Sequence, residues 1–306
     1  MTATGGTAEQ LQVGFIGTGV IGTPMAARLL SAGLLARVWN RTLDRTQQLQ
    51  RGGAQVANSP AEVASASDIV CLCLTDAAAT EAVLQGPNGL LRGHSPARPM
   101  IIDLSTSSPS ETRRLAQIYR EATGGCWIDA PVSGGPARAQ SGDLMIYCGG
   151  EQADFETAQP VFAALAQRAT LVGPLGSGQT LKLCSQLIAA PTIIAIAEAL
   201  AVAEANGLVP AAIPELLRGG LADSPLLQLF GSGMATPSAA RLGAIYTMLR
   251  AIDTGLELAR AAGLAAPVAA AAAEVYRAAA RFDQERDMTE LLEVCRGGDC
   301  HSVASR

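Results

Sequence analysis

Lys182 lies near the start of a long apolar segment, GSGQTLKLCSQLIAAPTIIAIAEAL, that is predicted to be helical. No other charge follows before Glu198, and Ser185 and Gln186 share one helix face with the lysine. An ammonium group in apolar surroundings has a lowered pKa and can exchange a proton near neutrality. The alternative is a lysine whose long chain carries its charge from a buried helix end to solvent. The segment by itself fits both interpretations.

The two histidines are poorer candidates for proton transfer. His94 lies in a loop rich in glycine and proline, and His301 lies among the last six residues. Neither position suits a histidine–carboxylate pair, so another group is expected to carry the proton. Cys295, Cys300 and His301 lack a second pair of donors, so no metal site is expected.

A glycine-rich turn directly follows the apolar run QVGFI and opens a predicted helix. Strand, turn and helix in this order give GxGxxG the context of a dinucleotide site, in which backbone N–H groups at the helix start face the pyrophosphate. The alternative is a tight turn that only packs a helix on a strand. The residues expected to contact the cofactor here are Gly17, Thr18, Gly19, Val20, Ile21 and Gly22.

The end of the second predicted strand bears on the choice of cofactor. It reads Trp39-Asn40-Arg41-Thr42, and no carboxylate occurs before Asp44. An NAD enzyme would place an acid there for the ribose hydroxyls, whereas Arg41 can pair with a 2′-phosphate and stack on adenine. NADP(H) is therefore favoured over NAD(H), which stays possible, with Asn40, Arg41 and Thr42 as contacts. The alternative is a surface arginine beside a turn asparagine.

The segment DAPVSGG at 129–135 predicts a site for a carboxylate. Ser133, Gly134 and Gly135 follow an apolar run and present a hydroxyl and accessible backbone N–H groups, which form an anion nest. Ligands bind at the carboxyl edge of strands in open α/β sheets. The alternative is a plain turn to the next strand.

The pattern along the chain predicts two domains. Up to about residue 173, apolar runs alternate with amphipathic segments, which predicts a mainly parallel sheet of the Rossmann type. The predicted strands are 12–16, 36–40, 68–74, 100–104, 126–132 and 143–148, and the predicted helices are 20–33, 43–52, 61–67, 77–84 and 109–121. After Gly178 the chain is predicted to be all helical, at 179–207, 211–219, 224–233, 238–263 and 267–281. We therefore expect an NADP-binding domain at 11–175, a helical substrate and oligomerisation domain at 176–296 joined by a long interdomain helix, and tails at 1–10 and 297–306.

Composition narrows the classes of partner. Of 306 residues, 49% are hydrophobic and 16% charged, and the net charge of −5 offers no basic surface for nucleic acid. No run of about twenty uninterrupted apolar residues predicts a membrane span, and the first ten residues do not resemble a secretory signal. Seven cysteines, an odd number, favour reduced thiols in the cytoplasm over a disulfide framework.

Together these motifs resemble the β-hydroxyacid dehydrogenase family, which includes 3-hydroxyisobutyrate dehydrogenase and tartronate semialdehyde reductase. The matching segments are GFIGTGVIGTPMA, the NRT at 40–42, Asp129 to Gly142, and Gly176 to Gln186. The resemblance implies hydride transfer between NADP(H) and a small 3-hydroxy acid or semialdehyde acid, in a homodimer or homotetramer. It also implies that Lys182 is the general acid/base. The contacts it implies are Ser133, Gly134 and Gly135 for the substrate carboxylate, Gln186 for the hydroxyl, and Leu74, Thr75 and Thr106 for the cofactor.

Three segments of the chain depart from the family pattern. Ser185 and Gln186 stand where two asparagines are usual, although glutamine also occurs at the second place. Arg138 replaces a usual glycine and can add a cation beside the substrate, and Arg250-Ala251 falls where a Lys-Asp pair is usual. We expect Arg250 to keep the cofactor contact and Arg138 to contact substrate. These departures leave the particular acid open.

Two alternative functions remain at this point. Imine reductases resemble this family in fold and NADPH use, but they usually have another residue in place of the lysine. The presence of Lys182 therefore argues against imine reduction. A non-catalytic NADP-binding protein would need neither Lys182 nor the Ser133 turn.

Overall fold

The computed structural model describes residues 11–93, 98–236, 241–281, 283 and 286–297. The chain divides into two compact units, Met1–Lys182 and Leu183–Arg306. In its described residues, the first unit combines a sheet with covering helices, and the second contains helices and turns. The predicted fold class, a Rossmann-type mainly parallel sheet followed by an all-helical part, is confirmed.

Eight strands form one sheet in the first unit, in the order β2-β1-β3-β4-β5-β7-β6, with β8 paired to β7. Their bounds are β1 (Val13–Ile16), β2 (Leu35–Trp39), β3 (Ile69–Leu72), β4 (Met100–Asp103), β5 (Trp127–Asp129), β6 (Val132–Ser133), β7 (Leu144–Gly149) and β8 (Ala166–Gly173). The first five strands are parallel, so Ile16 lies opposite Leu72, and Asp103 lies opposite Leu72 and Asp129. Strand order reverses between β1 and β3, and ligands of such sheets bind at the carboxyl ends of the strands there.

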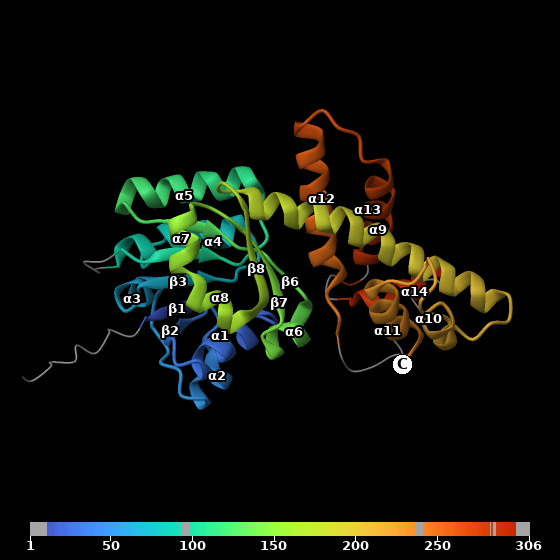
Figure 1. Ribbon diagram of the computed structural model, residues 1–306, viewed down its shortest axis with the longest axis horizontal. Helices are drawn as coiled ribbons and strands as arrows, with labels where there is room; N and C mark the ends of the chain where they lie inside the picture. Colours follow the sequence, from blue (N-terminus) through green and yellow to red (C-terminus); the bar gives the residue numbers. More distant parts are fainter. Residues whose placement is uncertain (1–10, 94–97, 237–240, 282, 284–285, 298–306) are drawn as a thin grey trace, which may run out of the picture. The chain divides into compact units, whose positions relative to one another are not determined.

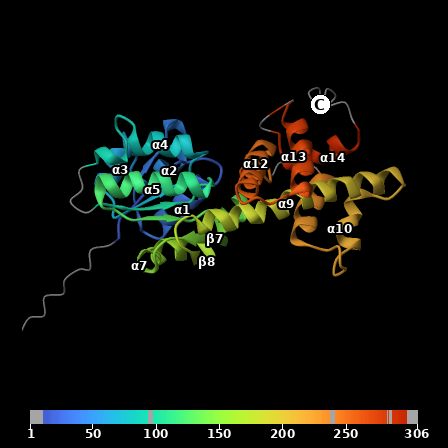
Figure 2. The same cartoon turned by 90° about the horizontal axis from the view of Figure 1, so that it is seen from above.

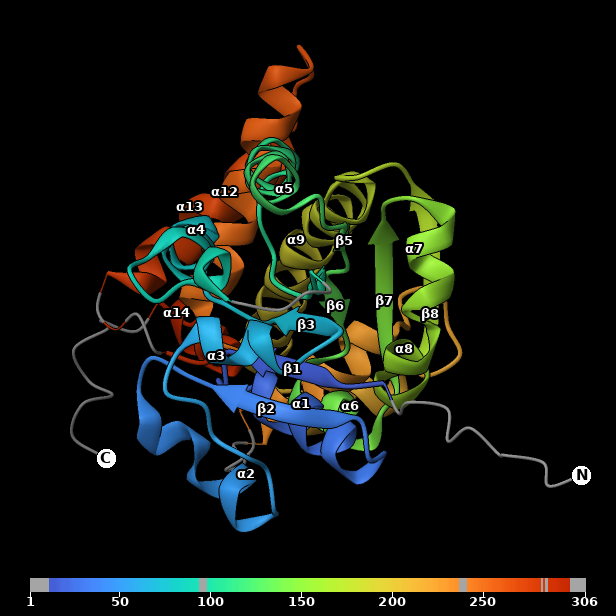
Figure 3. The ribbon, with the colours of Figure 1, turned by 90° about the vertical axis from the view of Figure 1, so that its left-hand side faces the viewer.

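Helices cover both faces of this sheet (Figures 1 and 3). Their bounds are α1 (Gly22–Ser31), α2 (Gln47–Arg51), α3 (Pro60–Ser65), α4 (Ala77–Gln85), α5 (Pro109–Thr123), α6 (Gly135–Ser141), α7 (Gln152–Thr157) and α8 (Gln159–Leu165). One face buries Leu29 of α1 and Phe162 of α8 in a core with Phe15 of β1. The other buries Leu84 of α4 in a core with Ile101 of β4. Because helices cover both faces of the sheet, β1, β3 and β4 are buried along their whole length.

The second unit has its own core. Its elements are the larger part of α9 (Ser177–Ala205), then α10 (Ile213–Leu216), α11 (Ser232–Ala235), α12 (Ile245–Ala261), α13 (Pro267–Ala280) and α14 (Leu291–Cys295). α12 and α13 lie side by side (Figure 2). Ile193 and Leu200 of α9 are fully buried and share a core with Ile252 and Tyr276. α9 is also long and apolar enough to cross a membrane, a test that core helices of globular proteins pass as well.

Several predicted boundaries were wrong, for local reasons. The run 126–132 forms two strands, β5 and β6, because Pro131 between them has no N–H to continue a ladder. The segment 43–52 begins as a 3-10 turn before α2, and 211–219 and 238–263 contain shorter helices than predicted. The predicted helix 224–233 is present, with a π-helical segment at Leu227–Gly231 that continues into α11. β8 was not predicted, because it is an edge strand with polar residues that lacks a continuous apolar run.

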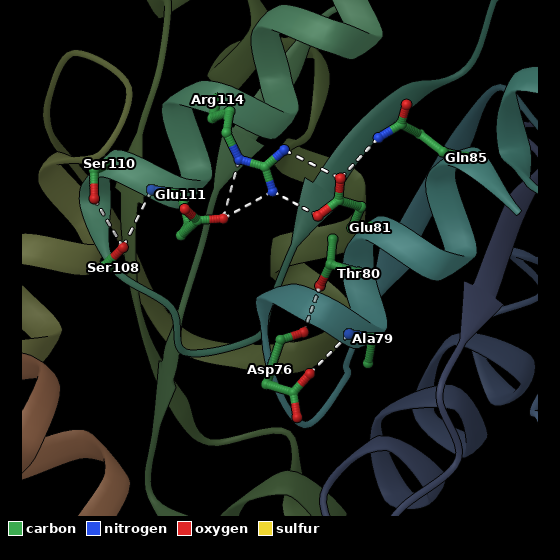
Figure 4. Close-up of polar contacts among 9 residues, drawn as sticks. All are labelled: Asp76, Ala79, Thr80, Glu81, Gln85, Ser108, Ser110, Glu111 and Arg114. Carbon is green, nitrogen blue, oxygen red and sulfur yellow. Dashed lines mark hydrogen bonds and ion pairs between the residues drawn. The ribbon is translucent and has the colours of Figure 1, made fainter.

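The helices that follow β3 and β4 begin with side-chain caps and are joined by one arginine (Figure 4). Asp76 accepts from the N–H of Ala79 at the start of α4, at 2.7 Å. Arg114 of α5 reaches Glu81 of α4 at 2.7 Å and Glu111 of its own helix at 2.9 Å. These helices start directly after the loops that carry the predicted cofactor contacts, so their caps fix where those loops end.

Core burial, and not the Arg114 ion pairs, should dominate the stability of this layer. Leu84→Ala removes a fully buried side chain and is expected to lower the free energy of unfolding by about 2–5 kcal/mol. Arg114→Ala removes solvent-exposed ion pairs and should leave the urea unfolding midpoint close to that of the wild type. Urea unfolding followed by circular dichroism measures both variants, and a larger loss for Arg114→Ala than for Leu84→Ala would contradict this.

Candidate active site

The glycine-rich turn lies at the carboxyl end of β1 and is tied to its neighbours by backbone hydrogen bonds. Gly17 N–H donates to the carbonyl of Trp39, at 3.0 Å, and a side chain at Gly17 would collide with the carbonyl of Cys73. Around Gly19, in contrast, there is open space where a Cβ would lie, and Val20 is 75% exposed. Open space at Gly19 and an exposed apolar side chain beside it fit the close approach of a dinucleotide.

Asn40 links the end of β2 to this turn. Its side-chain oxygen accepts from Thr18 N–H at 3.1 Å, and its amide group donates to the carbonyl of Thr42 at 2.8 Å. Arg41 between them is exposed, and the part of the chain that the structure describes contains no ion pair to it. Asn40 therefore shapes the turn, while the guanidinium of Arg41 stays available to an anion.

A serine joins the two loops that carry the other predicted cofactor contacts. Leu74 N–H donates to Ser105 Oγ at 2.9 Å, and Ser105 N–H donates to Asp103 Oδ1 at 3.0 Å. Thr75 lies next to Leu74, and Thr106 next to Ser105, so both threonines extend from this junction. Burial raises the pKa of Asp103 to about 6, and its hydrogen bonds with Ser105 oppose that rise.

The first turn of α9 is held by Asp129 at the end of β5. Asp129 Oδ1 accepts from Gly176 N–H and Oδ2 from Gln179 N–H, both at 2.7 Å. The side chain of Gln179 then donates to the carbonyl of Ser105 at 2.8 Å and accepts from Ser107 N–H at 3.0 Å. Asp129 and Gln179 are both 0% exposed. The start of α9 is thereby bonded to the loops at the carboxyl edge of the sheet.

Two further contacts restrict where the first turn of α9 can lie. Arg113 of α5 donates to the carbonyl of Leu175 at 3.0 Å, just before α9 begins. A side chain at Gly178 would collide with the carbonyl of Tyr147, so glycine is needed where α9 meets β7. Burial raises the pKa of Asp129 to about 6, and the two N–H donors oppose that rise.

Lys182 follows Gln179 by three residues on α9 and is 7% exposed. Burial lowers the pKa of its ammonium group to about 8 from the usual 10.5. It is also the only lysine in the sequence, in which 22 residues are lysine or arginine. Arginine keeps its charge near neutrality, so Lys182 alone among the lysine and arginine residues can titrate there. The structure buries this residue at the start of α9.

The predicted substrate turn connects β6 to α6 in the first unit. Ser133 ends β6, Gly135 begins α6, and Gly134 lies between them. Arg138 is exposed, and its stem lies against Gly134, because a Cβ there would be 2.9 Å from both Cβ and Cδ of the arginine.

Two predicted site residues belong to the second unit. Gln186 lies four residues beyond Lys182 on α9, and Arg250 lies on α12 with its guanidinium 5.9 Å from the ring centroid of Tyr246. Their roles stay predictions, as do those of the residues above. His94, Cys300 and His301 lie outside the described residues, and the six described cysteines are free thiols.

Sequence reasoning missed the residues that hold α9. Asp129 was considered as part of a substrate motif, whereas its carboxylate bonds the helix start. Gln179 and Ser105 had no signal beyond their spacing, because the hydrogen bonds between them cross 74 residues of chain. The uniqueness of Lys182, however, is visible in the sequence and would have strengthened its assignment.

Known proteins share this architecture. Residues 12–173 match the family model described as the NAD binding domain of 6-phosphogluconate dehydrogenase, and residues 176–295 match that described as NAD-binding of NADP-dependent 3-hydroxyisobutyrate dehydrogenase. The 2-hydroxy-3-oxopropionate reductase of Escherichia coli K12 is 36% identical over 295 residues, which are 96% of this chain and 100% of the reductase.

Two solved structures share the fold. A 3-hydroxyisobutyrate dehydrogenase of Mycobacterium tuberculosis, solved with L-serine, has a TM-score of 0.83 at 24% identity and covers 94% of this chain and 100% of its own. An imine reductase from Myxococcus stipitatus with NADP+ has a TM-score of 0.63 at 21% identity and covers 92% of this chain and 99% of its own. The imine reductase is thus the more distant of the two in fold.

A glycine-rich turn on a Rossmann-type sheet, with family matches over both units, defines an oxidoreductase that uses a nicotinamide cofactor. Relatives of this chain include enzymes named for small hydroxy acids, a 2-hydroxy-3-oxopropionate reductase and a 2-(hydroxymethyl)glutarate dehydrogenase. The chain belongs to the β-hydroxyacid dehydrogenase family and is an NAD(P)-dependent hydroxyacid dehydrogenase.

The pKa of Lys182 can be measured without assigning a crowded spectrum. Protein labelled with 13C-lysine should give one Cε resonance, because the chain has one lysine. We expect its midpoint near pH 8, since burial disfavours the charged form. Lys182→Met should remove the resonance and so assign it. A midpoint near 10.5 in the folded protein would show that the amine is hydrated.

Proposed function

We propose that this enzyme reversibly oxidises a small 3-hydroxy acid to its semialdehyde with NADP(H), and that Lys182 carries the proton of the substrate hydroxyl. The observation that supports this most is a single lysine, buried, with its pKa lowered to about 8, on a helix bonded to the carboxyl edge of the sheet. The nicotinamide ring, when bound, donates or accepts the hydride.

The proton chemistry of Lys182 follows from its pKa. In the oxidation direction the neutral amine accepts the hydroxyl proton, and in the reduction direction the ammonium group returns it. A pKa of about 8 leaves both forms populated near neutrality, where general acid and base catalysis are most effective. In this proposal Ser133, Gly134 and Gly135 hold the substrate carboxylate and Gln186 supports the hydroxyl.

The preference for NADP(H) is proposed from the end of β2. Arg41 is exposed, follows Asn40 and has no carboxylate beside it to repel a 2′-phosphate, although Asp44 is near in sequence. A guanidinium pairs with phosphate through two parallel hydrogen bonds. NAD(H) remains an alternative cofactor, and Arg250 a further proposed contact to it.

Imine reduction is the second candidate function, and the fold likeness to imine reductases supports it only at the level of the fold. Lys182 and the turn at Ser133 to Gly135 argue against it, because imine reductases that resemble this family usually replace the lysine and an imine substrate does not need a carboxylate site. The same residues argue against a protein that only binds NADP. An assay that includes a cyclic imine separates these functions.

The second unit is proposed to carry subunit contacts in a homodimer or homotetramer, in a cytoplasmic enzyme. Many large apolar side chains of this unit are exposed, and subunit contacts would bury them. Examples are Ile188, Val202, Leu216, Leu221 and Leu229.

Loss of the lysine amine should greatly lower turnover and spare cofactor binding. Lys182→Ala is expected to lower kcat about 10²–10⁴-fold, because a positioned acid/base contributes that much. The Kd for NADPH, from fluorescence titration, should stay near the wild-type value.

The substrate panel comprises 3-hydroxyisobutyrate, glycerate, threonate, tartronate semialdehyde and a cyclic imine, each with NADP(H) and NAD(H).

The pH dependence supplies the control. Oxidation needs the neutral amine, so its kcat/KM should rise with pH and level off above about 8, whereas the kcat/KM for reduction should fall above the same pH. Lys182→Arg keeps the charge but cannot exchange a proton near neutrality, so it should be as inactive as the alanine variant. Near-normal turnover in either variant would refute the role of Lys182.

Arg41 should determine the preference between cofactors. Arg41→Ala removes the proposed partner of the 2′-phosphate and is expected to raise KM for NADPH about 10- to 100-fold, as for the loss of a charged hydrogen bond. KM for NADH should change much less. A variant with an unchanged ratio of the two kcat/KM values would remove Arg41 from the cofactor site.

A further inference from the structure

The amino end of α9 is bonded to two separate parts of the sheet edge. Asp129, at the end of β5, accepts two N–H groups of the helix start. Gln179 bonds both sides of the loop after β4, through the carbonyl of Ser105 and the N–H of Ser107. All of these residues belong to the first unit, as does Lys182. The helix start therefore has little freedom to rotate or slide against the loops that carry the proposed cofactor contacts.

We propose that Gln179 and Asp129 are positioning residues for Lys182, which fix the first turn of α9 and so set the place of the lysine amine against the cofactor-binding edge of the sheet. This inference rests on the proposed role of Lys182. Neither residue is a proton donor or acceptor for the substrate in this scheme. Both act through the helix that carries the lysine.

The geometry favours positioning over packing for Gln179. An apolar side chain of similar volume would fill the same buried space, so packing alone does not need an amide. The amide instead makes two hydrogen bonds to a single loop. Its NH2 group donates to the Ser105 carbonyl at 2.8 Å, and its oxygen accepts from the Ser107 N–H at 3.0 Å. Lys182 lies three residues on, so a shift of Gln179 moves the lysine with it. Errors of about 1 Å in such a group can cost about 10²-fold in rate.

Gln179→Met is the principal test, because it keeps size and charge and removes both hydrogen bonds. We expect kcat to fall about 10- to 100-fold, with KM for the acid changing less. In 13C-lysine-labelled protein, the pH midpoint of the single Cε resonance should move up from about 8 toward 10.5, as water reaches a loosened helix start. Near-ultraviolet circular dichroism verifies that the variant is folded.

Thr180→Val is the matched control on the same turn. The Thr180 hydroxyl donates to the carbonyl of Gly176 at 2.9 Å, so it bonds the helix to itself and not to the sheet edge. This variant should keep both the wild-type kcat and the wild-type lysine midpoint. A folded Gln179→Met variant that also keeps both would overturn the inference, even if its melting temperature were lower.

Gln179→Glu tests the hydrogen bond itself and covers the case in which the methionine variant does not fold. Once ionised at alkaline pH, the new carboxylate cannot donate to the Ser105 carbonyl, so kcat relative to the wild type should be low there. At acid pH the protonated carboxyl can donate, and kcat relative to the wild type should recover. The titratable and charged groups around this network are Asp103, Asp129, Arg113 and Lys182, and all four are also present in the wild type, whose pH profile is the reference. Equal relative rates at both pH values would contradict the proposal.

The two proposals can fail separately. If Lys182→Ala keeps its turnover, the proposed function is wrong, whereas the lysine midpoint in Gln179→Met still reports whether the network holds the helix. If Lys182→Ala is inactive and the midpoint and kcat of Gln179→Met are those of the wild type, only the positioning role is wrong.

Discussion

The two hydrogen bonds from the start of α9 to the Asp129 carboxylate are the constraint on which this site depends. They join the end of a buried strand to the one helix that runs from the first unit into the second. A helix start has N–H groups without partners in the helix, and a carboxylate there satisfies two of them while complementing the helix dipole. The sheet edge, the helix and Lys182 thus become parts of one bonded assembly within the first unit.

Burial of the Asp129 carboxylate has a cost in stability, which its two hydrogen bonds reduce. Burial raises the pKa of Asp129 from 3.8 to about 6, so its contribution to folding falls as the pH rises through that window. The ionised carboxylate at neutral pH is therefore a cost to the stability of the fold. Asp103, whose pKa is also raised to about 6, adds a second such group. Two costly buried carboxylates at one sheet edge are easier to explain by the geometry they fix than by stability.

The sequence predicts the parts of this site that depend on local pattern. The turn after β1, the strands β1, β3 and β4, and the helical second half all follow from glycine spacing and apolar periodicity. It does not predict the junction at Ser105 and Gln179, since a hydrogen bond between residues 74 apart has no periodic signature. It also misses the break at Pro131 and the edge strand β8, where backbone chemistry and sheet position outweigh the apolar pattern.

The chain has one lysine among its 22 lysine and arginine residues, and the different chemistry of the two side chains explains what that lysine can do. Arginine keeps its charge at every accessible pH, so it can serve the surface, ion pairs and anion binding but cannot exchange a proton. Lysine is the cation whose pKa burial can bring near neutrality, and burial at the start of α9 does so for Lys182. A buried lysine also needs a rigid surrounding, because a mobile helix end would let water restore its ordinary pKa. The bonds to Asp129 and Gln179 supply that rigidity, so the chemistry of the amine and the anchoring of the helix are two aspects of one arrangement.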